Sequence, residues 1–179
     1  MQSDSQTAFT AIYHAQYPAV LAYMRRRSQP THSEDLTAEV FARAWRNFSS
    51  LEDIDSPLPW LYGISRNVVR EHYRAMEKSP TLVDHTEADA PTTKVAPEEF
   101  DAVDMSLDIN RALFALSESD REMLMLVAWE DLSHGEVAQV LNITPNNARV
   151  RLHRARTNLS AALTELTSHV SELSPGEKK

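Results

Sequence analysis

Basic and amide side chains gather in one short stretch, residues 144–163, and these residue types suit a specific chemical task. The stretch holds four arginines and no acidic residue, although the whole chain of 179 residues has a formal net charge of −8. Arginine and asparagine can form paired hydrogen bonds with the edges of DNA bases, and arginine also binds phosphate. The indicated chemistry is nucleic-acid recognition. The acidic remainder of the chain should weaken indiscriminate binding to phosphates.

The residue types needed for catalysis or metal binding lack a suitable arrangement. The three glycines are scattered, so the chain cannot build a glycine loop that cradles phosphate. Its seven histidines show no ligand spacing, and the absence of cysteine excludes disulfides and thiolate metal sites. Acidic pairs lie at expected helix starts, where capping and the helix dipole explain them. We therefore expect no enzyme, no cofactor and no metal.

Two capped helices are predicted around the basic stretch. Ser133 and Glu136 have the spacing of a capping box, which starts the first helix. Thr144 can cap a second helix that has Pro145 at its first position, where the missing N–H is not needed. Two short helices joined by a tight turn at Asn142-Ile143 form the helix-turn-helix pattern, whose second helix enters the DNA major groove.

The second of these helices should have one buried and one exposed side. At about 100° per residue, Ala148, Leu152, Ala155 and Leu159 fall on one side and form the expected buried stripe. The residues expected on the exposed side are Asn146, Arg149, Val150, His153 and Arg154.

The first 48 residues contain two further helical patterns. Phe9 to Arg27 predicts two short helices, or one helix kinked at Pro18. Ser33 to Phe48 predicts a strong helix that Ser33 caps. This helix has two apolar stripes, so it is either central in its domain or docked on a partner as well as on its own core.

A basic ridge is expected on the next helix, which Ser56 should cap and which has Pro57 and Pro59 in its first turn. Arginines at every fourth position beside aromatic residues suit a surface that tracks a backbone and stacks separated bases. An ordinary solvated helix face explains the same pattern. The residues concerned are Tyr62, Arg66, Asn67, Arg70, Tyr73 and Arg74.

The predicted architecture is all-α, with two small helical domains and a flexible linker. The first domain is expected at residues 1–75, and an acidic linker containing proline and threonine at 76–103. The second domain should span 104–165, with a helix capped by Ser119 and Glu122, before a disordered tail at 166–179. No apolar run resembles a signal peptide or reaches the roughly 20 residues of a membrane span, which predicts a cytoplasmic protein.

Three segments in this order resemble the bacterial extracytoplasmic function sigma factors, which are promoter-recognition subunits of RNA polymerase. They are EDLTAEVFARAW (34–45), PWLYGISRNVVREHYR (59–74) and LSESDREMLMLVAWEDLSHGEVAQVLNITPNNARVRLHRAR (116–156). The resemblance implies that the first segment binds the clamp coiled coil of the polymerase's largest subunit. Ala38 stands where many members have glutamine. The implied contact residues are Asp35, Ala38, Glu39, Phe41 and Trp45.

The resemblance also implies two contacts with promoter DNA. The six ridge residues would bind the −10 strand together with the variable loop from Phe48 to Ser56, where a base leaves the stack. The second helix of the helix-turn-helix would read the −35 duplex. Family members are usually controlled by an anti-sigma factor. The implied −35 residues are Asn146, Asn147, Arg149, Val150, His153 and Arg154.

Two other functions explain part of the sequence. A helix-turn-helix regulator that is not a polymerase subunit would account for residues 133–156 equally well. Such a regulator would not account for the arginine ridge or for the two apolar stripes of the helix from Ser33 to Phe48. An adaptor that keeps the fold without binding DNA predicts that replacing Arg149 and Arg154 leaves function intact.

Overall fold

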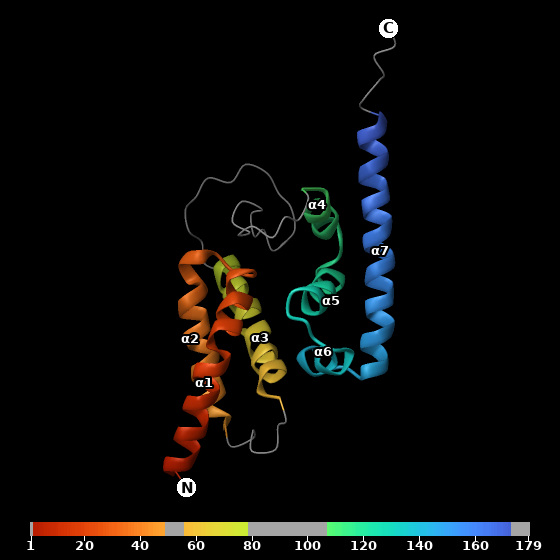
Figure 1. Ribbon diagram of the computed structural model, residues 1–179. Helices are drawn as coiled ribbons and strands as arrows, with labels where there is room; N and C mark the ends of the chain where they lie inside the picture. Colours follow the sequence, from red (N-terminus) through yellow and green to blue (C-terminus); the bar gives the residue numbers. More distant parts are fainter. Residues whose placement is uncertain (1, 49–55, 79–106, 173–179) are drawn as a thin grey trace. The chain divides into compact units, whose positions relative to one another are not determined.

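The computed structural model describes residues 2–48, 56–78 and 107–172, and regular structure within these ranges is entirely helical (Figure 1). These helices belong to two compact units, which confirms the predicted all-α class. The first unit contains α1 (Gln2–Arg25), α2 (Pro30–Arg46) and α3 (Pro57–Lys78). The second unit contains α4 (Leu107–Ala115), α5 (Glu118–Ala128) and α7 (Pro145–Glu172), and α6 (His134–Leu141) directly precedes α7.

Helix α1 is continuous through Pro18, which excludes the alternative of two short helices. Its aromatic residues Phe9, Tyr13 and Tyr17 are spaced by four and so lie on one face. All three rings contact Phe41 of α2, with centroid distances of 6.5, 4.7 and 6.0 Å. Phe9 and Tyr13 precede Pro18 by one turn or more, and Tyr17 is next to it. The packing of their rings stabilises α1 and offsets the loss of the helix hydrogen bond that proline cannot form.

Helix α2 begins at Pro30, so the prediction that Ser33 caps it is wrong. Pro30 occupies the first helical position, where its fixed φ is favourable and its missing N–H is not needed. Ser33 is buried inside the helix, and its hydroxyl donates to the Pro30 carbonyl at 2.8 Å. The Thr37 hydroxyl likewise donates to the Ser33 carbonyl at 2.7 Å, so the two buried hydroxyls are satisfied locally.

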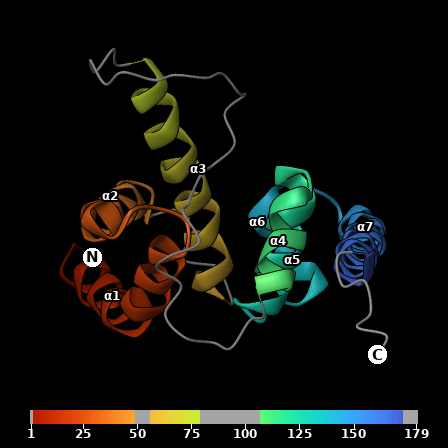
Figure 2. The same cartoon turned by 90° about the horizontal axis from the view of Figure 1, so that it is seen from above.

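Helix α3 starts at Pro57 as predicted, and each of α1, α2 and α3 packs against the other two (Figure 2). Leu61 and Val68 of α3 are buried in the core of this unit, while Ile64 is half-buried. The core also includes the following residues of α1 and α2: Val20, Tyr23, Met24, Val40 and Ala44.

In the second unit, α7 packs against both α4 and α5, and Arg121 closes the end of α4. The Arg121 guanidinium donates to the carbonyls of Leu113, Phe114 and Leu116 at 3.0, 3.2 and 3.1 Å. Leu113 and Phe114 belong to the last turn of α4, where carbonyls have no N–H donor four residues ahead in the helix, and Leu116 follows directly after the helix. Burial lowers the pKa of Arg121, but the group stays charged because its ordinary pKa is far above neutrality.

Helix α5 starts two residues earlier than the predicted capping box implies. Ser117 is its N-cap, and the Ser117 hydroxyl accepts from the Asp120 backbone N–H at 3.2 Å. Ser119 therefore lies within the first turn, and the prediction that it caps the helix is wrong. Ser117 and Ser119 are only two positions apart, so the sequence does not show which of them caps the helix. The hydrogen bond to the Asp120 N–H identifies Ser117.

Replacing Ser117 with alanine should lower the free energy of unfolding of the second unit by about 1 kcal/mol, because a helix N–H loses its acceptor. The matched control Ser119→Ala should change it by less than about 0.5 kcal/mol. Urea denaturation followed by Trp129 fluorescence would measure this, in a chain whose other two tryptophans, Trp45 and Trp60, are phenylalanine. Equal losses in both variants would contradict the assignment of Ser117 as the cap.

Two predicted boundaries change. Helix α3 continues to Lys78, so residues 76–78 belong to a helix and not to the linker. Helix α7 continues to Glu172, so the prediction of a disordered tail from residue 166 is wrong for residues 166–172. The rest of the predicted linker and tail, together with residues 49–55 of the variable loop, lies outside the described residues.

Candidate nucleic-acid interface

The predicted capping box at the start of α6 is present. The Ser133 backbone N–H donates to Glu136 Oε2 at 2.8 Å, and the Glu136 N–H donates to Ser133 Oγ at 3.3 Å. Hydrogen bonds from the side chain and backbone of Ser133 hold the pKa of Glu136 below its usual value. Glu136 is therefore ionised at neutral pH, and this terminus is fixed by reciprocal hydrogen bonds.

The turn between α6 and α7 is built by asparagine and threonine. Asn142 has a φ of 52°, in the left-handed region that asparagine tolerates better than most residues. The Ile143 N–H then donates to the Ala138 carbonyl at 3.0 Å and closes α6. Thr144 Oγ1 accepts from the Asn147 N–H at 3.2 Å, and α7 begins at Pro145, as predicted. The sequence thus positions α7 tightly after α6.

The first turns of α7 have the two sides that helical spacing predicts. Ala148, Leu152 and Ala155 are each at most 2% exposed, and Leu159 is half-buried. Val150 is 60% exposed, which leaves its methyl groups available for contact. The remaining predicted −35 residues are also exposed: Asn146, Asn147, Arg149, His153 and Arg154.

Two polar contacts orient the arginines on this face. Arg149 donates through Nη2 to Asn146 Oδ1 at 3.1 Å. Arg154 Nη2 lies 3.4 Å from Asp120 Oδ1, and Asn158 Nδ2 donates to Asp120 Oδ2 at 2.8 Å. Asp120 belongs to α5 and was not predicted as part of the site. No local sequence pattern could have identified it, because its partners are 34 and 38 residues away.

Helix α3 presents the predicted basic ridge, with Arg70 and Arg74 exposed and Arg66 half-buried. Asn67 is also exposed. Tyr73 is half-buried, and its hydroxyl donates to the Arg27 carbonyl at 3.2 Å. Burial raises the pKa of Tyr73, so the phenol stays protonated at neutral pH and keeps this hydrogen bond.

Tyr62 does not lie on the ridge. It is 3% exposed and stacks on Tyr23 of α1, with a centroid distance of 4.9 Å and an interplanar angle of 23°. The prediction that Tyr62 contacts a DNA strand is therefore corrected, because its ring belongs to the core. Arg27, just after α1, also joins this core: its guanidinium lies 3.7 Å from the centroid of the Tyr23 ring.

Helix α2 exposes part of the predicted contact surface. Asp35, Ala38 and Trp45 are exposed, and Glu39 is half-buried. Phe41, by contrast, is only 4% exposed because the aromatic residues of α1 cover it. Phe41 is therefore a core residue and not a surface contact.

Trp45 is the large aromatic residue that α2 leaves 44% exposed. Its ring packs edge-on against Phe9 with centroids 5.0 Å apart, and it stacks with Phe48 at 6.0 Å. These contacts hold the indole in one place while one side remains open. Such a rigid, exposed aromatic ring is suited to a protein interface.

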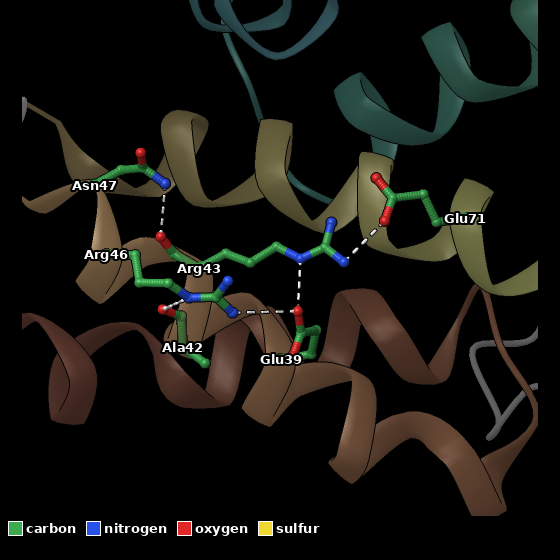
Figure 3. A network of polar contacts seen from close by, with 6 residues as sticks. All are labelled: Glu39, Ala42, Arg43, Arg46, Asn47 and Glu71. Atoms are coloured by element: carbon green, nitrogen blue, oxygen red, sulfur yellow. Dashed lines mark hydrogen bonds and ion pairs between the residues drawn. The ribbon is translucent and has the colours of Figure 1, made fainter.

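An ion-pair network between α2 and α3 was not predicted (Figure 3). Arg43 lies between two carboxylates: its Nε donates to Glu39 Oε1 at 2.7 Å, and its Nη2 lies 2.8 Å from Glu71 Oε2. Arg46 adds a longer ion pair to Glu39 at 3.6 Å. The Arg43 guanidinium lowers the pKa of Glu71, chiefly by donating a hydrogen bond to its carboxylate.

The same residues line a pocket of ≈ 490 Å³ together with Asn47, Ile64 and Asn67. The spacing of Glu39 and Arg43 could have indicated their ion pair on one helix. The partnership of Arg43 with Glu71 depends on how α2 packs against α3, which the spacing does not reveal.

Comparison with known proteins identifies both parts of the chain. Residues 12–78 match the sigma-70 region 2 family, and residues 106–159 match sigma-70 region 4. The RNA polymerase sigma factor YlaC of Bacillus subtilis is 27% identical over 157 residues, covering 86% of this chain and 91% of YlaC. The ECF RNA polymerase sigma factor SigW of the same organism is 26% identical over 147 residues, covering 75% of this chain and 76% of SigW.

The chain belongs to the extracytoplasmic function sigma factors. It is thus a transcription initiation factor, and the sigma-70 regions imply RNA polymerase and promoter DNA as its partners. The family that the sequence resembles is confirmed.

A solved structure supports the same fold for this sigma factor. CnrH, in complex with the cytosolic domain of CnrY, superposes with a TM-score of 0.57 and 26% identity, covering 89% of this chain and 90% of CnrH. Within residues 2–48, 56–78 and 107–172, no helix of the sigma factor is both long and apolar enough to cross a membrane. The same ranges contain no cluster of three or more His, Cys, Asp or Glu residues that could hold a metal ion.

Proposed function

We propose that the first turns of α7 read the −35 duplex in the major groove. The observation that carries this proposal is the alternation of a buried apolar stripe with an exposed face containing arginine, asparagine and Val150. Arginine can bind guanine through two hydrogen bonds, and asparagine can bind adenine in the same way. Val150 suits contact with a thymine methyl group. The α6 cap and turn support insertion of α7 as a rigid unit.

The −10 strand is assigned to the ridge on α3, with Arg66, Arg70 and Arg74 contacting the backbone. Asn67 lies beside this ridge and can donate hydrogen bonds to a base or phosphate. Tyr73 is a less accessible member, because its hydroxyl is engaged by the Arg27 carbonyl. Tyr62 is left out of the assignment because its ring is buried.

Core polymerase binding is assigned to α2, with Trp45 as the anchor and with Asp35, Ala38 and the half-buried Glu39 earlier on the same helix. The family resemblance suggests the clamp coiled coil of the largest subunit as the partner. The Arg43 network supports this role, because it holds the Glu39 carboxylate in place. With these assignments, residues 1–78 form the polymerase and −10 part, and residues 104–165 form the −35 part.

An anti-sigma factor is the proposed regulator, and it would cover the surfaces used by polymerase. The partly exposed Trp45 is consistent with a second protein competing for α2. CnrH, which shares the fold, has been solved in complex with the cytosolic domain of another protein, CnrY. By analogy, we expect this sigma factor to bind a regulatory protein.

In vitro transcription tests the whole proposal. Start sites mapped after overexpression would define the promoter, and core polymerase would then be assayed with and without the purified chain. We expect initiation from that promoter only when the chain is present, and reduced initiation when either the −10 or the −35 element is scrambled. A chain that binds the duplex tightly alone but adds nothing to core polymerase would instead be an independent helix-turn-helix regulator.

A further inference from the structure

A buried carboxylate lies behind the proposed −35 face. Asp120 is 5% exposed, and its backbone N–H is already held by the Ser117 cap. Its two carboxylate oxygens accept from different side chains of α7: Oδ2 from Asn158 at 2.8 Å and Oδ1 from Arg154 at 3.4 Å. A buried carboxylate needs such partners, so its position relative to α7 is well determined.

The ion pair is asymmetric, because the side chain of Asp120 is 7% exposed and that of Arg154 is 63% exposed. One Nη of the guanidinium therefore faces the carboxylate, while most of the side chain remains accessible. Arginine has five N–H donors in a planar arrangement, so one contact leaves others for a ligand. An arginine restrained before binding loses less conformational freedom on binding.

We propose that Asp120 is a positioning residue for promoter recognition: it directs the Arg154 guanidinium toward −35 DNA without touching the DNA itself. The inference rests on the proposed −35 role of Arg154. Asn158 assists by holding the other carboxylate oxygen, which fixes the plane of the Asp120 carboxylate. Specificity at the −35 element thus depends on a residue of α5 that is outside the recognition helix.

General electrostatics predicts the opposite effect of removing this charge. Replacing an acid near DNA with a neutral residue should strengthen binding to phosphates. A positioning role predicts that the same replacement weakens specific recognition, because Arg154 loses its restraint. The sign of the change therefore separates the two explanations.

The test is a double-mutant cycle with Asp120→Asn and Arg154→Ala in the full chain, assayed with core polymerase for −35-dependent initiation. Asp120→Asn should lower initiation by about two- to tenfold, a coupling typical of residues in contact. It should cause no further loss when Arg154 is already alanine. The matched control Glu118→Gln removes an exposed acid of the same α5 turn and should not lower initiation.

Thermal unfolding of each variant separates positioning from folding. If Asp120→Asn fails to fold, Asn158→Ala takes its place: it should lower initiation in the parent chain and not in the Arg154→Ala chain. Equal losses in both backgrounds, or a gain in specific initiation, would overturn the positioning role. If Arg154→Ala alone has no effect, the proposed −35 role of Arg154 is wrong and the inference falls with it. A loss with Arg154→Ala but none with Asp120→Asn would overturn the inference alone.

Discussion

Replacing Arg149 with alanine should lower −35-dependent initiation by about 1–3 kcal/mol, or roughly 5- to 150-fold, if its guanidinium makes a bidentate base contact. Arg149 is exposed on α7, and its hydrogen bond to Asn146 at 3.1 Å restrains it near the start of the helix. Run-off transcription on promoters with each −35 base varied would measure the effect. The loss should be largest on the native −35 sequence, because the variant no longer distinguishes one base pair.

Arg111→Ala is the control for Arg149→Ala, since it removes the same charge from an exposed position on α4 in the same unit. It should leave base preference unchanged. Arg149→Lys should restore little of the discrimination, because an ammonium group cannot form the planar pair of hydrogen bonds. If Arg149→Ala keeps the parental preference at every −35 position, Arg149 is not a specificity residue.

Replacing Trp45 with alanine should weaken binding to core polymerase by about 2 kcal/mol, or roughly 30-fold, the typical loss for a truncated aromatic anchor. The ring is 44% exposed, and its contacts with Phe9 and Phe48 hold it in a fixed position. An interface gains more from such a ring than from a mobile side chain, because less freedom is lost on binding. Titration of a fluorescently labelled chain with core polymerase in the absence of DNA would give the affinity.

Two further variants separate this interface from general effects. Met76→Ala truncates another exposed apolar residue of the first unit, 46% exposed on α3, and should leave core affinity nearly unchanged. Ala38→Arg adds bulk at an exposed α2 position and keeps a good helix former, so it should weaken core binding without unfolding α2. Full core affinity in both Trp45→Ala and Ala38→Arg would place the polymerase contact elsewhere.

The helix-turn-helix was predictable because its determinants are local. The Ser133–Glu136 capping box, the Thr144 cap and the buried stripe of α7 all depend on residues within a few positions of one another. Helical geometry alone relates such positions. The same reasoning failed where two neighbouring serines could each cap a helix, as at Ser117 and Ser119. It also failed where a proline starts the helix before the expected cap, as at Pro30.

The candidate sites were less predictable, because exposure depends on what packs above a residue. Phe41 and Tyr62 have spacings that allow surface positions, and both are buried by aromatic residues of α1. Continuity of α1 through Pro18 likewise did not follow from the sequence, which allowed either two short helices or one kinked helix. Phe41 and Phe48 are buried, which explains part of the wide apolar arc at this end of the first unit, and Trp45 remains the exposed part that suits a partner.

The sequence by itself determined which segments are helical, the family and the face of α7 that can meet DNA, since these follow from helical periodicity, capping and the order of the recognisable segments. Only the tertiary structure decided which aromatic residues stay exposed and which charges pair. Arg43 with Glu71, and Asp120 with Arg154, join different helices. Such pairs form when the packing of helices brings residues that are distant in sequence to within hydrogen-bonding distance. The spacing of residues along the sequence does not reveal which of them will meet in this way.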